Sequence, residues 1–527
     1  MSIRITFRPS WCRNLGSVLL ALASVLLINV TGYAVAQDPI PDSGAAVFGN
    51  PVIPGDHPDP SIIRVGETYW MSSTSDDWSP QFPLFRSSDL HHWIPAGAIF
   101  PHQPSWATGS FWAPELVYDH GHVLVYYVGR KRQGPLCVAV ATAPNPGGPY
   151  TDHGPIECQQ DGSIDPAFAR DENGKPYLIW KEDGNSIHKP TPLWAQPLTF
   201  DLLHPMGKKV QLIVNDPGSW EGGVVEAPYI LHHDGHFYLF YAGNACCGTE
   251  CNYAEGVARA DRLLGPYEKD PANPVIHADA TWKCPGHGSA VTTPSGENYF
   301  LYHAYPREGS IYLGRESVLD QIKWTPTGWP TINSGQGPGE TPTEAPAALT
   351  DQFASQSLNA GWQWPVNRNP KVRVGNGSLT LTVGARKENF IAHSLCSSEY
   401  VSSVLLQPGG TALGSLTVIG NAKHSFGLGR RGPKLELWRQ DGRLPRRVLW
   451  HQQVLKAATL HLRVTSSDLG KQLTYGYSLD GEHWLPAGNA IDVSTLPQWD
   501  QGLRVGLDVQ GSAGSSATFR AFTLQRQ

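Results

Sequence analysis

Hydrophobic and polar residues alternate over short stretches of this chain, and the stretches come in pairs. The first pair begins at Ser61, where the run SIIRV leads into a glycine turn and then into TYWMSS. Alternation over a few residues predicts a β-strand, and two such runs joined by a glycine turn predict a β-hairpin. We therefore expect strands to dominate this part of the fold.

The same hairpin pattern occurs in five copies. The copies align on five turn glycines, and the residues at their heads are spaced 53, 53, 61 and 61 residues apart. A strand-only unit repeated at this period predicts a five-bladed β-propeller. The first strand of each blade lines the central channel, so we expect the head residues to face one pocket. The alternative is that each head residue only caps its own hairpin, a place usually taken by interchangeable small polar residues. The turn glycines are Gly66, Gly121, Gly174, Gly235 and Gly296, and the head residues are Asp59, Trp112, Asp165, Glu226 and His287.

The second half of the chain has a different organisation. After Ile332 comes SGQGPGETPTEAP, which has no apolar period and has the composition of a linker. Alternating runs such as SLTLTV at Ser378 and LHLRVT at Leu460 then return, separated by short turns. This pattern predicts a β-sandwich or jelly roll. We expect a propeller over residues 45–333, a linker over 334–347 and a β-sandwich over 348–527.

The N-terminus has the order of a secretory signal. Arg4, Arg8 and Arg13 precede an apolar run from Leu15 to Val30, and the small residues Ala34–Ala36 follow. This order predicts a cleaved signal over residues 1–36, and hence a secreted or periplasmic protein with no membrane contact after cleavage. An uncleaved anchor is the alternative, but the run is shorter than the ~20 residues that a membrane span needs.

Cleavage would remove Cys12 and leave seven of the eight cysteines. An odd number means that at least one thiol stays free or pairs between chains. The run CCGTEC, from Cys246 to Cys251, has two interpretations: a local disulfide bridge or a metal site. The bridge is favoured because neither CxxC pairs nor histidines stand at the spacing of a zinc site.

Composition narrows the choice of partner. The net charge is −6, so no basic surface for phosphate is expected and nucleic acid is an improbable partner. Only 16% of residues are charged, while 18 Trp and 19 Tyr supply flat faces with polar edges. Aromatic faces beside carboxylates suit sugars, although these residues also fill cores.

Three carboxylates in one pocket would acquire different pKa values, since burial and mutual repulsion raise some of them. Glycoside hydrolysis needs such a difference, because one carboxylic acid protonates the leaving oxygen while a carboxylate activates water or attacks the sugar. A calcium site built from Asp59, Asp165 and Glu226 is one alternative. Three unrelated surface acids are the other.

The chain from about Val47 to Ile332 resembles glycoside hydrolase family 43, whose five-bladed propeller enzymes remove xylose or arabinose units with inversion. The motifs that carry the resemblance are HPDPS at His57, FWAPE at Phe111, GSIDPAF at Gly162, VVEAPYI at Val224, GHGS at Gly286 and GRES at Gly314. Leu473–Gly488 resembles, more weakly, the concanavalin A-like module appended to several family members. That module can lend a loop to the pocket, bind carbohydrate by itself or be purely structural.

The resemblance implies roles for individual residues. Asp59 would be the general base, Glu226 the general acid, and Asp165 the group that adjusts the pKa of the acid and orients it. A nearby anionic Asp165 is expected to raise the pKa of Glu226 by repulsion. Trp112 would form a wall of the sugar pocket. His287 would lie at its base, where some family members hold a hydrated calcium ion.

Further candidates for substrate contact are less firmly defined. Arg315 matches a pocket arginine of the family, with a surface salt bridge as the alternative. His57 could be a ligand, could contact and position a residue that is one, or could pack the loop in which it lies. Phe111, with Trp78, Trp106 and Phe168, could stack on sugars or fill the blade cores.

The sequence thus predicts a glycosidase that releases β-xylosyl or α-L-arabinofuranosyl ends from hemicellulose, with no required cofactor. Alternatives are arabinanase or galactanase specificity on the same fold, and retention remains open in place of inversion. A non-catalytic carbohydrate-binding propeller would keep Trp112 but would not need Asp59 and Glu226 together. The sequence leaves the oligomeric state open.

Overall fold

A computed structural model describes residues 49–339, 341–342, 348–442, 444, 446–454 and 458–527. The predicted signal, residues 1–36, lies outside these residues, and so does part of the predicted linker. Within the described ranges, no helix is both long and apolar enough to cross a bilayer.

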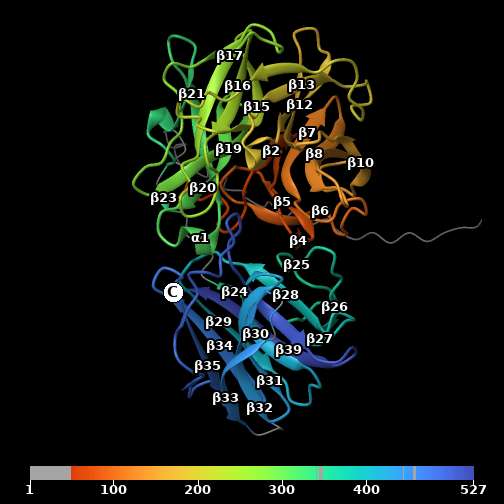
Figure 1. The fold of residues 1–527 in the computed structure, drawn as a ribbon, viewed down its shortest axis with the longest axis vertical. Helices are drawn as coiled ribbons and strands as arrows, with labels where there is room; N and C mark the ends of the chain where they lie inside the picture. The colour runs from red at the N-terminus through yellow and green to blue at the C-terminus, as the bar shows by residue number, and fades with distance from the viewer. Residues whose placement is uncertain (1–48, 340, 343–347, 443, 445, 455–457) are drawn as a thin grey trace, which may run out of the picture. The chain divides into compact units, whose positions relative to one another are not determined.

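The first part of the chain forms five antiparallel sheets of four strands, and each sheet uses consecutive stretches of sequence (Figure 1). Sheet one contains β2 (Ser61–Val65), β3 (Thr68–Ser72), β5 (Gln81–Ser87) and β6 (Ile94–Phe100). Sheet two contains β7 (Trp112–Asp119), β8 (His122–Arg130), β9 (Leu136–Ala143) and β10 (Thr151–Glu157). Sheet three contains β11 (Ser163–Arg170), β12 (Pro176–Glu182), β13 (Leu193–Pro197) and β14 (Val210–Ile213).

Sheet four contains β15 (Val225–His233), β16 (His236–Gly243), β17 (Ala254–Ala260) and β18 (Glu268–Lys269). Sheet five contains β19 (Trp282–Thr292), β20 (Asn298–Pro306), β21 (Glu316–Trp324) and β22 (Pro330–Ile332). The first strands contact one another in the order β2, β7, β11, β15 and β19, and β19 contacts β2 again. The five sheets therefore form a closed ring, which confirms the predicted propeller.

Each neighbouring pair of sheets encloses its own hydrophobic cluster. Strand β8 shows why, since Val125 and Tyr127 join the cluster shared with sheet one, whereas Leu124 and Tyr126 join the cluster shared with sheet three. Successive side chains of a strand point to opposite faces, so a strand buried on both faces is apolar throughout. The turn glycines of the five hairpins all have positive φ, between 62° and 89°, as predicted for turn positions.

The second part of the chain forms two larger sheets. One contains β24 (Ala348–Asp351), β26 (Lys371–Gly375), β27 (Ser378–Thr382), β29 (Tyr400–Leu406), β34 (Leu460–Ser467), β35 (Gln472–Ser478), β36 (Leu485–Pro486), β37 (Ile491–Asp492) and β39 (Ser516–Arg526). The other contains β28 (Glu388–Ser394), β30 (Leu413–Asn421), β31 (His424–Arg431), β32 (Lys434–Asp441), β33 (Arg447–Gln453) and β38 (Arg504–Gln510). Side chains of both sheets share one large core, which confirms the predicted β-sandwich.

Short elements complete the described fold. β1 (Gly49–Asn50) pairs with β23 (Thr341–Pro342), and β4 (Trp78–Ser79) pairs with β25 (Trp364–Pro365). The helical segments are α1 (Ser310–Leu313), η1 (Asn185–Ile187) and η2 (Asn333–Gly335).

Three disulfides are present among the described residues: Cys137–Cys158, Cys246–Cys247 and Cys251–Cys284. Cys396 is a free thiol, as the odd count required. The expected local bridge within the CCGTEC run is confirmed. Its third cysteine, Cys251, instead bonds to Cys284 on β19.

Candidate active site

The five head residues line a single pocket of about 720 Å³. Asp59 lies just before β2, and the other four come from the first strands of the remaining sheets: Trp112 on β7, Asp165 on β11, Glu226 on β15 and His287 on β19. The predicted convergence is therefore confirmed.

The backbone has an unusual conformation at the same place in every sheet. Residues with φ between 44° and 55° stand at or directly after each head residue: Asp59, Ala113, Asp165, Ala227 and His287. At β7, β11, β15 and β19 the pairing with the next strand also shifts register close to this point. Such bulges redirect a side chain at a strand end, and strained backbone of this kind gathers at functional sites.

Asp59 is a buried carboxylate surrounded by donors. Its Oδ1 lies 2.9 Å from Nη1 of Arg315 and 3.3 Å from Nδ1 of His287, and its Oδ2 accepts a 2.7 Å hydrogen bond from the Thr74 hydroxyl. Burial alone would raise the pKa of Asp59, but Arg315 and His287 outweigh it and hold the pKa well below its ordinary value. Asp59 is thus ionised at neutral pH.

His303, on β20, contacts the backbone of Asp59. Its Nδ1 accepts a 3.1 Å hydrogen bond from the backbone N–H of Asp59, and its ring stacks on Tyr253. Burial lowers the pKa of His303 to about 4, more than the neighbouring carboxylate raises it. The ring is therefore neutral at neutral pH and positions the Asp59 backbone.

Glu226 is held differently. Nζ of Lys181 lies 2.6 Å from its Oε2, and the Tyr253 hydroxyl donates a 2.8 Å hydrogen bond to its Oε1. Burial would raise the pKa of Glu226, but Lys181 and Tyr253 outweigh burial and lower it. The expectation of a raised Glu226 pKa is therefore wrong for the unliganded protein, because the buried Lys181 on β12 was not anticipated.

Asp165 shows the opposite behaviour. Its Oδ2 accepts a 3.0 Å hydrogen bond from the backbone N–H of Ala227. Burial, together with the charge of Glu226, raises the pKa of Asp165 to about 6, while His287 and Lys181 act against this rise. The two carboxyl groups therefore have different pKa values, and Asp165 is the one of the two that takes up a proton first as the pH falls.

Aromatic and charged side chains complete the wall. The Trp112 indole donates a 2.8 Å hydrogen bond to Asp76, and Trp112 lines the pocket, as predicted. Arg315 is buried and paired with Asp59, so it is not a surface salt bridge. Trp499 and Asp500 of the sandwich part also line the pocket, and the Asp500 carbonyl lies 3.4 Å from Nη2 of Arg315.

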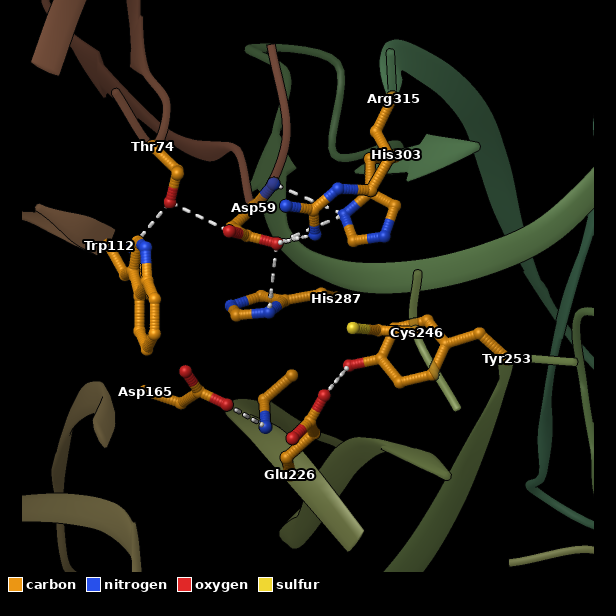
Figure 2. A network of polar contacts seen from close by, with 12 residues as sticks. Asp59, Thr74, Trp112, Asp165, Glu226, Cys246, Tyr253, His287, His303 and Arg315 are labelled. Atoms are coloured by element: carbon orange, nitrogen blue, oxygen red, sulfur yellow. Dashed lines mark hydrogen bonds and ion pairs between the residues drawn. The ribbon is translucent and has the colours of Figure 1, made fainter. Parts of the chain in front are cut away.

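Figure 2 shows how the polar groups are distributed. Asp59 and Glu226 lie on opposite sides of His287, and Asp165 lies on the side of Glu226. A sugar between them would have the Asp59 carboxylate on one side and the two carboxyl groups of Asp165 and Glu226, which differ in pKa, on the other. This arrangement suits acid and base catalysis at a glycosidic bond.

Several sequence candidates lie outside the pocket lining. Phe111 is fully buried in the cluster between sheets one and two, against Phe82. Trp106 packs against the same cluster and Phe168 against the next one, so both fill blade cores. Trp78 is also buried and packs on Phe390. Phe111, Trp106 and Phe168 thus fill blade cores, whereas Trp78 belongs to a cluster with residues of the sandwich part. We do not retain Phe111 as a substrate contact.

His57 is a supporting residue rather than a pocket wall. Its backbone carbonyl accepts a 2.8 Å hydrogen bond from Ser317, and its ring meets Phe85 edge-on. Burial, assisted by the charge of Arg504, lowers the pKa of His57 to about 4. The ring is neutral at neutral pH and packs the loop that carries Asp59.

Calcium near His287 remains a prediction. Among the described residues, no group of three or more His, Cys, Asp or Glu side chains is gathered as metal ligands. Calcium prefers six or more oxygen ligands. A calcium ion near His287 would have to be held largely by water, and the proposed mechanism does not involve it.

Residues 48–330 match the family described as Glycosyl hydrolases family 43. The chain belongs to this family. Residues 350–525 match the Beta xylosidase C-terminal Concanavalin A-like domain. A family 43 protein with these two matches is a glycosidase, and its named relatives include several glycosidases.

Two family 43 relatives illustrate the range of similarity. A putative beta-xylosidase of Escherichia coli (strain K12) is 27% identical over 82% of this chain and 90% of its own length. A xylosidase/arabinosidase of Butyrivibrio fibrisolvens is 28% identical over 55% of this chain, but the match spans only 57% of the relative.

Solved family 43 structures share the fold. A variant of the GH43 protein BlXynB from Bacillus licheniformis superposes with a TM-score of 0.77 at 25% identity, over 91% of this chain and 100% of that one. The Bacteroides ovatus Xyloglucan PUL GH43B superposes with a TM-score of 0.78 at 21% identity, over 91% and 100%.

Proposed function

We propose that this family 43 protein is an inverting glycosidase that releases terminal β-xylosyl or α-L-arabinofuranosyl units from hemicellulose. The observation that carries the proposal is the convergence of Asp59, Asp165 and Glu226 on one pocket, where Arg315 pairs with Asp59 and Lys181 pairs with Glu226. Relatives named beta-xylosidase, and one from Bacteroides ovatus named non-reducing end alpha-L-arabinofuranosidase, support the choice of sugars.

Asp59 takes the role of general base. A base must be ionised before it can accept a proton from water, and Arg315 keeps Asp59 in that state. Thr74 and His303 orient the carboxylate, so that a water can lie between Asp59 and the anomeric carbon.

Glu226 takes the role of general acid, with Asp165 as its partner. Asp165, with a pKa of about 6, is the carboxyl of the pair that is protonated first as the pH falls. We propose that a bound sugar excludes water from the pair and moves the proton to Glu226, while Asp183 competes for Lys181 at 3.2 Å. Glu226 then protonates the departing oxygen, and Asp165 is left as the anion that Lys181 stabilises.

The test is a panel of 4-nitrophenyl β-xyloside, α-L-arabinofuranoside and galactoside, with the first-formed sugar anomer followed by NMR. Inversion predicts that a β-xyloside first yields α-xylose. First-formed β-xylose would contradict inversion, and a preference for the galactoside would favour the alternative specificity. Binding without turnover of any of the three would favour a carbohydrate-binding propeller.

We also propose that the protein is exported. Three disulfides occur among the described residues, and disulfides persist in oxidising compartments. One relative, from Cellvibrio japonicus, is named an extracellular exo-alpha-(1->5)-L-arabinofuranosidase. N-terminal sequencing of the protein recovered outside the cytoplasm should begin close to Gln37. A retained Met1 would contradict cleavage.

A further inference from the structure

The Cys246–Cys247 disulfide is the one covalent feature of the described pocket lining that the proposed mechanism does not use. Both cysteines line the pocket and are half-buried. The bridge lies in the loop that follows β16, immediately after the strand paired with the one that carries Glu226.

A disulfide between adjacent residues contributes little to the stability of a fold. A disulfide stabilises a fold mainly by closing a loop in the unfolded chain, and the effect grows with the length of that loop. Cys246 and Cys247 are separated by 1 position, so their bridge closes essentially no loop. The neighbouring Cys251–Cys284 bridge has a separation of 33 and ties the same segment to β19.

The loop holds the bridge in place by other contacts. The backbone N–H of Asn252 donates to the Ala245 carbonyl at 3.0 Å, and the Ala245 N–H donates to the side chain of Asn252 at 3.1 Å. The Gly248 N–H donates to the Tyr305 hydroxyl at 3.4 Å. These bonds, with Cys251–Cys284, fix the direction in which the Cys246–Cys247 pair faces.

The bridge lies on the side of the pocket where the proposed proton donor stands. Cys246 packs against the cluster that contains Ala227 and Tyr253, and the Tyr253 hydroxyl bonds to Glu226. Figure 2 shows the Cys246 sulfur on the side of Tyr253 and Glu226, away from Trp112. A group that leaves after protonation by Glu226 departs on this side.

We infer that the Cys246–Cys247 disulfide forms an apolar binding surface for the ring of the departing sugar residue, an inference that rests on the proposed function. Sulfur is polarizable and makes favourable contacts with apolar groups, including the C–H face of a sugar ring. Because the bridge joins neighbouring side chains, neither can rotate away. The surface is therefore ordered before the substrate binds.

The test uses two substrates that differ only in the ring of the leaving group. They are the disaccharide and the methyl glycoside of whichever sugar the panel identifies, for example xylobiose and methyl β-xyloside. In the Cys246→Ala/Cys247→Ala variant we expect kcat/KM to fall about tenfold on the disaccharide, the loss expected for roughly 50 Å² of apolar contact. On the methyl glycoside we expect a change within about twofold.

Two further measurements separate the inference from a structural effect. Wild-type protein treated with a phosphine reductant, with the reduced pair identified by alkylation and peptide mass spectrometry, should show the same selective loss and recover on reoxidation. A Cys137→Ser/Cys158→Ser variant, which removes a bridge outside the pocket lining, should keep the ratio between the two substrates. The alkaline limb of the pH profile should not move, since the bridge does not act through Glu226.

Equal losses on both substrates, or no loss on either, would overturn the inference while wild-type turnover upholds the proposed function. A shifted alkaline limb would overturn it as well, because the bridge would then act by positioning Glu226. If wild-type protein hydrolyses none of the glycosides, the proposed function fails and the inference that rests on it falls too.

Discussion

A buried carboxylate remains ionised only where cations and hydrogen-bond donors replace the water it has lost. Asp59 has both, from Arg315 and Thr74. Asp165 accepts a bond from the Ala227 backbone but has no such cation in direct contact among the described residues, and its pKa is about 6. Two aspartates of one pocket thus acquire different pKa values from their partners.

Replacing Asp59 should affect stability as well as chemistry. Asp59→Ala is expected to lower kcat/KM at least about a thousandfold, because the base is lost. It should also lower the free energy of unfolding by about 3 kcal/mol, because buried Arg315 loses its carboxylate. Steady-state kinetics and urea denaturation measure the two effects. The double variant Asp59→Ala/Arg315→Met should regain stability without activity, and an active Asp59→Ala variant would refute the assigned base.

The pH dependence of a Lys181 variant tests whether Glu226 is the general acid. Lys181 lowers the pKa of Glu226, so Lys181→Met should raise it. A proton donor with a raised pKa stays protonated to higher pH. The alkaline limb of kcat/KM should therefore move upward by about one pH unit or more. Lys209→Met, which lies directly before β14 of the same sheet and outside the pocket lining, is the control. An unmoved limb would mean that Glu226 is not the donor.

At the scale of single elements, the first strand of each sheet combines two tasks. Beyond its first residues, the strand packs on both faces into the hydrophobic clusters between sheets. The bulge near its start directs one side chain into the pocket. Polar groups bind the strands to one another as well. Glu115 on β7 accepts a 2.8 Å bond from Ser61 on β2, whose hydroxyl in turn accepts from the Leu116 N–H.

The buried Glu115 carboxyl should make the free energy of unfolding depend on pH. Burial raises the pKa of Glu115 to about 8, despite its bond from Ser61. The folded protein therefore keeps a proton that the unfolded chain loses near the ordinary value of 4.5, and this contribution to stability disappears as the pH rises from about 4.5 to about 8. Glu115→Gln cannot ionise. The free energy of unfolding of this variant, relative to that of the wild type, should therefore be higher at pH 8 than at pH 5. The difference should be on the order of 3 kcal/mol.

Denaturation curves at the two pH values measure that difference. Glu67→Gln, an exposed residue at the turn of the first hairpin, should not change it. If Glu115→Gln follows the wild-type pH dependence, the carboxyl is ionised in the folded protein and the assignment of a buried neutral acid is wrong.

The parts of the site that could be predicted from sequence are those that recur. The hairpins, their turn glycines and the five head residues repeat in register, so convergence on one pocket followed from the fold. Lys181, Tyr253 and His303 could not be found this way, because Lys181 and His303 come from second strands and Tyr253 from the segment between two strands. One signal was present for Lys181: it ends the otherwise apolar run YLIW, a position that buries a charge only beside a partner.

At the scale of the whole molecule, the sandwich part completes the pocket. Arg504 on β38 pairs with Asp56 at 3.3 Å, with both side chains buried, and lies over the Trp78 ring. The Gly502 N–H also donates to Asp56 at 3.1 Å. These contacts fix the segment that carries Trp499 and Asp500. Of the three roles weighed for the C-terminal module, contribution to the pocket is the one that this geometry supports.

Trp499 tests that contribution directly. Its side chain is 62% exposed although it lines the pocket, so its removal should leave the fold intact. Trp499→Ala is expected to reduce kcat/KM about tenfold through loss of an aromatic face, with an unchanged thermal transition. Leu485→Ala, at 53% exposure on the same part of the chain, is the matched control. Equal activity of the two variants would show that the sandwich part does not act on the substrate.

The closed ring of sheets has one junction that the chain does not continue across, between sheet five and sheet one. Asp59 reaches over it to Arg315 and His303, and the Ile62 N–H reaches over it to Ser289. Asp59, the proposed general base, therefore also joins sheet one to sheet five. Transient separation of sheet five from sheet one would break the contacts of Asp59 with Arg315 and His303. A ligand that binds to Asp59 should therefore slow amide hydrogen exchange along β2 and β19 more than elsewhere in the propeller.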